Sequence, residues 1–139
     1  MLILKITDNN GMYGWGEVWC NFPLTGAEHR AKLIDNVFKP LLANFNIITP
    51  EKTYEYLVSK TKILSIQSGE PGPIAQCIAG IDIAIHDLIG KVENISLWKK
   101  FGGNKNIIPC YASGINPTKP ELTVKAVSYT HLRAHETNS

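Results

Sequence analysis

Near the start of the chain, polar and apolar positions alternate with the two-residue period of a β-strand. Residues 2–6 are apolar and partly β-branched, and residues 8–11 (Asp-Asn-Asn-Gly) suit a tight turn. Over residues 13–19 the aromatic side chains share one face with Glu17, and the glycines share the other with Val18. These runs together predict a β-hairpin.

Three later segments carry apolar residues at helical spacing. We expect a first helix from Gly26 with a bend or break near Pro40, because proline cannot continue a helix without distortion. A second helix should begin at Thr49, which can cap it, and a third should run over about 74–91 after a loop at 68–73. The predicted apolar positions are Ala31, Ile34, Val37, Phe38, Leu41, Tyr54, Leu57, Val58, Ile63, Ile74, Cys77, Ile78, Ile81, Ile85 and Leu88.

The third predicted helix also carries small residues that allow a neighbour to approach closely. They are Ala75, Ala79, Gly80 and Ala84. Residues 107–113 predict a further strand, and residues 117–126 the start of another helix. The expected fold class is α+β.

Composition excludes several classes of protein. A chain of 139 residues with 44% hydrophobic and 19% charged residues is typical of one globular domain. The net charge of +2, with scattered lysines, gives no reason to expect a nucleic-acid or membrane partner. No apolar run reaches the roughly 18–20 residues that span a bilayer. Three separated cysteines predict neither a disulfide framework nor a zinc site, and favour reduced thiols in a cytoplasmic protein.

Four motifs in order give the chain its strongest signature. They are Gly-Trp-Gly-Glu at 14–17, an Ile- and Asp-rich helix at 79–91, Leu-Trp-Lys-Lys-Phe-Gly-Gly at 97–103, and Tyr-Ala-Ser at 111–113. Together they resemble the capping domain of the enolase superfamily, in its mandelate racemase and muconate-lactonising branch. The resemblance runs from residue 2 to about residue 116.

The resemblance implies a division of the chain. Residues 1–106 would form the capping domain, a β-hairpin or meander plus a three-helix bundle, lacking the family's first strand. Residues 107–126 would be the first strand and helix of a truncated TIM-type barrel. Residues 127–139 are similar to a translated sequencing adapter, so we expect them to be non-native. His131 and His135 in this tail therefore receive no metal-binding role.

The family's chemistry is the removal of a proton α to a carboxylate, with the enediolate held by magnesium. Its lysine bases and acidic metal ligands lie on barrel strands and cannot be located here. The pattern Lys60-Thr-Lys62 precedes any barrel strand and reads as an exposed helix face. We therefore assign no catalytic or metal residue and expect magnesium only in the complete enzyme. The fragment itself should be inactive.

Substrate contacts are expected in two places. The loop after Glu17 corresponds to a specificity loop of the family, which makes Trp19, Asn21 and Phe22 candidates; the alternative is that the two aromatic residues are plain packing residues. Ser113, at the end of the first predicted barrel strand, is the fourth candidate.

Two acids and a histidine on the third predicted helix invite a metal or catalytic hypothesis. Asp82 and His86 are four residues apart and share a helix face, and Asp87 follows them. No further ligand-type residue is evident near them, so a structural polar pair is the interpretation we prefer.

The sequence thus predicts a fragment of a dehydratase or racemase that acts on a hydroxy or sugar acid. The expected partners are a small-molecule carboxylate and the missing barrel domain, in a homo-oligomeric enzyme. Two alternatives stay open: a cycloisomerase or dipeptide epimerase of the same family, and a small α+β binding module without catalysis.

Overall fold

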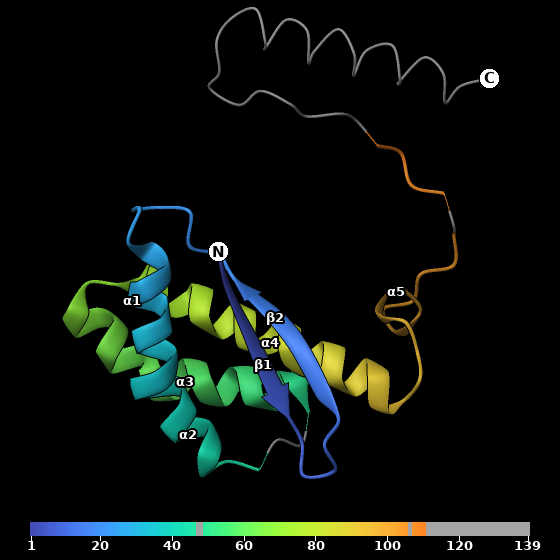
Figure 1. Cartoon of the computed structure of the whole chain (residues 1–139), viewed down its shortest axis with the longest axis horizontal. Helices are drawn as coiled ribbons and strands as arrows, with labels where there is room; N and C mark the ends of the chain where they lie inside the picture. The colour runs from blue at the N-terminus through green and yellow to red at the C-terminus, as the bar shows by residue number, and fades with distance from the viewer. Residues whose placement is uncertain (47–48, 106, 111–139) are drawn as a thin grey trace, which may run out of the picture. The chain divides into compact units, whose positions relative to one another are not determined.

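The computed structural model describes residues 1–46, 49–105 and 107–110. Its first compact unit covers Met1–Gly103 and contains every helix and strand of the described residues. In chain order the elements are β1 (Leu2–Thr7), β2 (Tyr13–Val18), α1 (Gly26–Leu33), η1 (Ile34–Phe38), α2 (Lys39–Ala43), α3 (Pro50–Ser68), α4 (Pro71–Val92) and α5 (Leu97–Lys100). The α+β fold class predicted from the sequence is confirmed (Figure 1).

The predicted hairpin forms from β1 and β2, which pair antiparallel in a two-stranded sheet. Asp8 shapes the turn, since its carboxylate accepts hydrogen bonds from the backbone N–H groups of Asn10 (2.9 Å) and Met12 (2.8 Å). Gly11 completes the turn with a φ of 83°, a conformation that side chains rarely adopt. Short polar side chains and a glycine therefore close the hairpin as the sequence predicts.

Strand β2 lies along α4 (Figure 1). Its glycine face is turned toward the helix. A methyl group at Gly14 would clash with the Ala84 carbonyl oxygen, and one at Gly16 would clash with the Gly80 carbonyl oxygen. Gly80 in turn leaves room for the Val18 side chain. Of the small residues predicted to allow close approach, Gly80 and Ala84 do so, whereas Ala75 and Ala79 are exposed.

The segment from α1 to α2 is one continuous helical run and does not break at Pro40. Proline cannot donate a backbone hydrogen bond, and its ring crowds the carbonyl group four residues earlier in an α-helix. The π-helical turn η1 directly precedes this point and widens the backbone spacing there. Phe38, at the end of η1, is fully buried in the core. A change of helix type thus stands where a bend or break was expected, and the break does not occur.

Helix α3 begins as predicted, with the Thr49 side chain accepting a hydrogen bond from the backbone N–H of Lys52 (3.2 Å). Its buried face differs from the prediction. Leu57 is buried together with Thr53 and Thr61, whose hydroxyl groups each donate to the carbonyl four residues earlier at 2.8 Å. Because these hydroxyls are satisfied within the helix, threonine can stand in the core. The predicted apolar positions Tyr54, Val58 and Ile63 are exposed instead.

The loop predicted at 68–73 is reduced to a two-residue connection. Helix α3 ends at Ser68, Gly69 caps it with a left-handed φ of 68°, and α4 already begins at Pro71. Prolines in the first helical turn lose nothing, because those N–H groups have no partner within the helix. Proline and glycine therefore mark a tight helix connection here, and α4 starts three residues before the predicted position.

Helix α4 supplies most of the core. Each residue of the core cluster has at most 4% of its surface exposed. The cluster consists of Val18, Phe38, Leu57, Ile74, Cys77, Ile78, Ile81 and Ile85. By length and composition alone α4 could cross a membrane, although the sequence has no uninterrupted apolar run of that length. Its predicted apolar stripe faces β2, α3 and α1, which is the pattern of a buried central helix.

Beyond α5, residues 104–105 and 107–110 form no helix or strand. The strand predicted at 107–113 is therefore not formed at residues 107–110, and residues 111–113 lie outside the described part. A barrel strand is stabilised by the strands beside it, and the described residues supply no such neighbour. The predicted helix at 117–126 and the predicted non-native tail also lie outside the described residues.

Substituting Gly16→Ala should lower the free energy of unfolding by about 3 kcal/mol or more, because the new methyl group would press two backbones apart. The matched control is Gly72→Ala in α4, where a methyl group would meet nothing within 4 Å. We expect the control to be neutral or stabilising by up to about 1 kcal/mol. Urea unfolding followed by circular dichroism measures both changes, and equal destabilisation of the two variants would contradict the packing argument.

The three thiols should differ sharply in reactivity. Burial raises the pKa of the Cys77 thiol to about 12, and Cys20 is only 6% exposed, whereas Cys110 is exposed. With Ellman's reagent at pH 8, we expect Cys110 to react fast and the other two thiols on the order of a hundredfold more slowly until the chain is unfolded. In Cys110→Ala the fast phase should vanish. Rapid modification of a second thiol in the native protein would show that Cys20 and Cys77 are not both buried.

Candidate functional site

The segment between β2 and α1 is an exposed loop that carries three of the four predicted substrate contacts. Trp19 is 48% exposed and Phe22 is 73% exposed, and Asn21 between them is exposed as well. The two aromatic rings lie 6.2 Å apart, tilted by 53°. Neither ring belongs to the core of the first unit, so their part in substrate contact stays a prediction. The fourth predicted contact, Ser113, lies outside the described residues.

Both ends of this loop are anchored in the interior. Cys20 is buried after β2, and Gly26 is buried at the start of α1. A side chain at Gly26 would approach the Cys20 carbonyl oxygen to 2.8 Å, so glycine lets the two ends come together. The Gly26 N–H also donates to the Pro23 carbonyl oxygen at 2.8 Å, and the Phe22–Pro23 peptide is cis. The anchors leave the residues between them exposed.

Arg30 lies beneath the loop, a functional candidate that the sequence analysis missed. It is only 5% exposed, and its Nε and Nη2 both donate to Gln76 Oε1 on α4, at 3.0 and 2.8 Å. Nη2 also donates to the Phe22 carbonyl oxygen at 3.4 Å. A signal was present in the sequence, because Arg30 stands four residues before Ile34 and eight before Phe38, on the predicted apolar face of the helix.

Asp82 and His86 form the polar pair predicted on α4. His86 Nε2 lies 3.8 Å from Asp82 Oδ1, and the imidazole ring meets the Phe101 ring edge-on at 5.1 Å between centroids. Within the part of the chain that the structure describes, no group of three histidine, cysteine, aspartate or glutamate residues could hold a metal ion. The pair packs α4 against the segment after α5.

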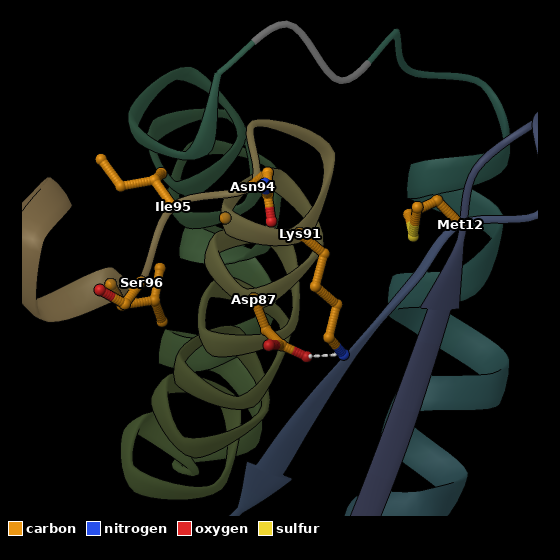
Figure 2. Close-up of a pocket in the computed structure, with 8 residues that line it drawn as sticks. Met12, Asp87, Lys91, Asn94, Ile95 and Ser96 are labelled. Carbon is orange, nitrogen blue, oxygen red and sulfur yellow. Dashed lines mark hydrogen bonds and ion pairs between the residues drawn. The ribbon is translucent and has the colours of Figure 1, made fainter.

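Asp87, weighed in the sequence as part of a metal or catalytic group, instead hydrogen-bonds to the backbone of β2. Its Oδ2 accepts hydrogen bonds from the Trp15 backbone N–H (2.8 Å) and from Lys91 Nζ (2.7 Å), while Lys91 also donates to the Tyr13 carbonyl oxygen (3.2 Å). Figure 2 shows the ion pair in a pocket between the end of α4 and the hairpin turn, with Met12 on its strand side. Both charged groups hydrogen-bond to the backbone of β2, so the pair fastens β2 to α4.

The lysine pair of α3 lies as expected. Lys60 and Lys62 are exposed on either side of buried Thr61, and Lys60 lies 5.7 Å from the centre of the Tyr56 ring. Glu17 is exposed on the outer face of the hairpin, and His29 on α1 pairs with Glu70 at 3.3 Å. Among the described residues, the exposed loop between β2 and α1 thus remains the candidate site for substrate contact.

The Asp87 clamp should make stability depend on pH. The hydrogen bond from Lys91 is the main cause that lowers the pKa of the Asp87 carboxyl, with that from Trp15 adding to it. The stabilisation is present above the ordinary carboxyl pKa of about 3.9, and it is lost as the pH falls through the lowered pKa of the folded state. We expect Asp87→Asn to cost about 1–2 kcal/mol at pH 7 and progressively less towards pH 3 in urea titrations.

The control for this prediction is Asp82→Asn on the same helix, which removes a carboxylate that makes no hydrogen bond to the strand. A difference between wild type and Asp87→Asn that stays constant from pH 7 to pH 3 would contradict the clamp.

Comparison with known proteins agrees with this geometry. The family model for the mandelate racemase / muconate lactonizing enzyme N-terminal domain matches residues 1–102. A crystal structure of a mandelate racemase/muconate lactonizing enzyme from Bordetella bronchiseptica RB50 is 46% identical, with a TM-score of 0.83 over 91% of this chain and 35% of that one.

Two curated relatives are more distant. The D-xylonate dehydratase of Haloferax volcanii is 28% identical over 73% of this chain and 22% of its own length. The 3,6-anhydro-alpha-L-galactonate cycloisomerase of Streptomyces coelicolor is 26% identical over 90% of this chain and 33% of its own length. The chain thus spans about a fifth to a third of these relatives. With the hairpin, the helices and the family match in agreement, the chain belongs to the mandelate racemase / muconate lactonizing enzyme family through its N-terminal domain.

Proposed function

We propose that this chain is the capping part of an enzyme that removes the proton α to a carboxylate of a hydroxy or sugar acid, as a dehydratase or racemase. The observation that carries the proposal is the family match over residues 1–102. Relatives named D-xylonate dehydratase and arabinonate dehydratase support a sugar acid as the substrate class. The capping part alone would be inactive, because the proton-abstracting bases of the family would lie on the barrel strands.

In this proposal the exposed loop acts as a lid over the substrate. Trp19 and Phe22 present two aromatic faces that can exclude water and shape a pocket. Asn21 between them can donate a hydrogen bond to a substrate hydroxyl or carboxylate. The lid would select the substrate, and the reacting groups would come from the rest of the enzyme. Ser113, which lies outside the described residues, is the fourth contact of this proposal.

Magnesium, which family membership implies, finds no site among the described residues. Its acidic ligands and the proton-abstracting bases would belong to the barrel domain that begins at about residue 107. Bound there, magnesium would stabilise the negative charge that develops on the substrate carboxylate. The capping residues would contribute substrate binding and exclusion of water only.

A cycloisomerase or dipeptide epimerase is the second candidate. The relatives named 3,6-anhydro-alpha-L-galactonate cycloisomerase and L-Ala-D/L-Glu epimerase favour it. The two branches differ in the downstream base, a histidine–aspartate pair for the first and a second lysine for the other. The third candidate is a small α+β binding module, which should be a cooperatively unfolding monomer when made without the last 13 residues.

We infer a cytoplasmic location from three cysteines that form no disulfide in the described residues. A homo-oligomeric complete enzyme follows from family membership alone. The low net charge of +2 supports a small-molecule substrate over nucleic acid or a membrane surface as partner.

The first test is long-read sequencing of the source DNA across codon 126, followed by expression of the complete protein. We expect the frame to continue into a Lys-x-Lys strand and spaced acidic residues. With magnesium in D2O, the protein should exchange the α-proton of a sugar acid or eliminate water from it, as followed by NMR. A native stop codon after Ser139, or a complete protein inactive on every sugar acid, hydroxy acid and dipeptide supplied, would overturn the proposal.

The lid is tested in the same protein. Asn21→Ala should raise KM by about tenfold, because a hydrogen bond to a polar substrate is lost. Lys62→Met, on the exposed face of α3, is the matched control and should leave KM unchanged. Equal KM values for both variants would show that the loop does not contact the substrate.

A further inference from the structure

Arg30 is a buried charge without a charged partner in the described part of the chain. Its side chain is 5% exposed, and no ion pair of the described residues includes it. Its acceptors are neutral, the Gln76 side chain and the Phe22 carbonyl group. Burying a charge in this way is costly, and apolar residues of similar size often give a more stable protein. Stability alone therefore does not account for an arginine at this position.

The guanidinium links the candidate lid to the core helix. Gln76 on α4 holds it through two hydrogen bonds to one oxygen, which fixes the plane of the group. From that plane Nη2 reaches the Phe22 carbonyl oxygen, and Nη1 lies 3.4 Å from His29 Nδ1. Among the described residues, Arg30 has the only side chain that hydrogen-bonds to the backbone between Trp19 and Thr25. Within the described residues, Arg30 on α1 thus links the loop to Gln76 on α4.

We propose that Arg30 is a positioning residue that sets the conformation of the loop carrying Trp19, Asn21 and Phe22. Gln76 orients the guanidinium, and the guanidinium holds the peptide at Phe22. This places the two aromatic rings and the Asn21 amide in a fixed arrangement before substrate arrives, which lowers the ordering cost of binding. The inference rests on the proposed function of the loop as a substrate lid. Arg30 itself does not touch the substrate.

The hold on the loop is tested in the full chain by amide hydrogen exchange with mass spectrometry. We compare Arg30→Met, which keeps much of the length and loses every donor, with Arg30→Lys, which keeps one charged donor. Lys32→Met is the matched control, because Lys32 is exposed on the same helix. We expect exchange of the amides at 19–22 to be about tenfold faster in Arg30→Met, partly rescued in Arg30→Lys and unchanged in the control.

Gln76 supplies a second pair of variants that does not remove the arginine. Gln76→Leu frees the guanidinium from α4 and should speed loop exchange, though less than Arg30→Met does. Gln76→Glu keeps the acceptor and adds the missing opposite charge. Its loop amides should exchange at the wild-type rate or more slowly. Circular dichroism of each variant gives its global stability. Loop exchange that changes only in proportion to global stability would overturn the positioning role.

The consequence for substrate is measured in the complete enzyme as a split between KM and kcat. Arg30→Met should raise KM by about tenfold with kcat within about twofold, because binding is disturbed and the reacting groups lie elsewhere. Arg30→Lys should restore part of the loss. A fall in kcat at unchanged KM would overturn the proposal.

The two proposals fail in distinguishable ways. Faster loop exchange in Arg30→Met, combined with an Asn21→Ala variant of normal KM, would overturn the lid function and leave the hold of Arg30 on the loop standing. Unchanged loop exchange, combined with a raised KM in Asn21→Ala, would overturn the role of Arg30 and leave the lid function standing.

Discussion

The backbone of β2 lies directly on the backbone of α4, and the rest of the first unit is arranged around this contact. Gly14 and Gly16 on the strand and Gly80 on the helix remove the side chains that would otherwise hold the two elements apart. The Asp87–Lys91 pair then fastens the strand by hydrogen bonds to backbone groups of Trp15 and Tyr13. Packing sets the distance between the two elements, and the charged clamp joins them at Tyr13 and Trp15.

The candidate lid depends on that arrangement. It leaves β2 immediately after the packed segment, is closed by the contact between Cys20 and Gly26, and is held from below by Arg30. Because Gln76 lies on α4 as well, the same helix carries the strand that precedes the loop and the side chain that orients the arginine. A loop on such a scaffold can vary in sequence and still present its side chains from a defined place.

Patterns that depend on local chemistry could be predicted well. The hairpin with its Asp8–Gly11 turn, the Thr49 cap and the apolar stripe of α4 were all predicted from spacing and residue type, and the structure contains them. The buried face of a helix was predicted poorly where it depends on which side chains the neighbouring elements leave room for. On α3 the buried face uses two threonines whose hydroxyls bond within the helix, which no count of apolar residues can find.

The sequence by itself determined the α+β class, the hairpin, the helical segments and, through four ordered motifs, the family. These features follow from periodicity and turn chemistry, which act over a few residues. Only the tertiary structure decided that the helix continues through Pro40, that Asp87 binds a strand 72 residues away, and that Arg30 is buried beneath the loop. The physical reason is that a polar side chain takes its role from the partner it meets, and that partner is brought to it by packing between distant segments.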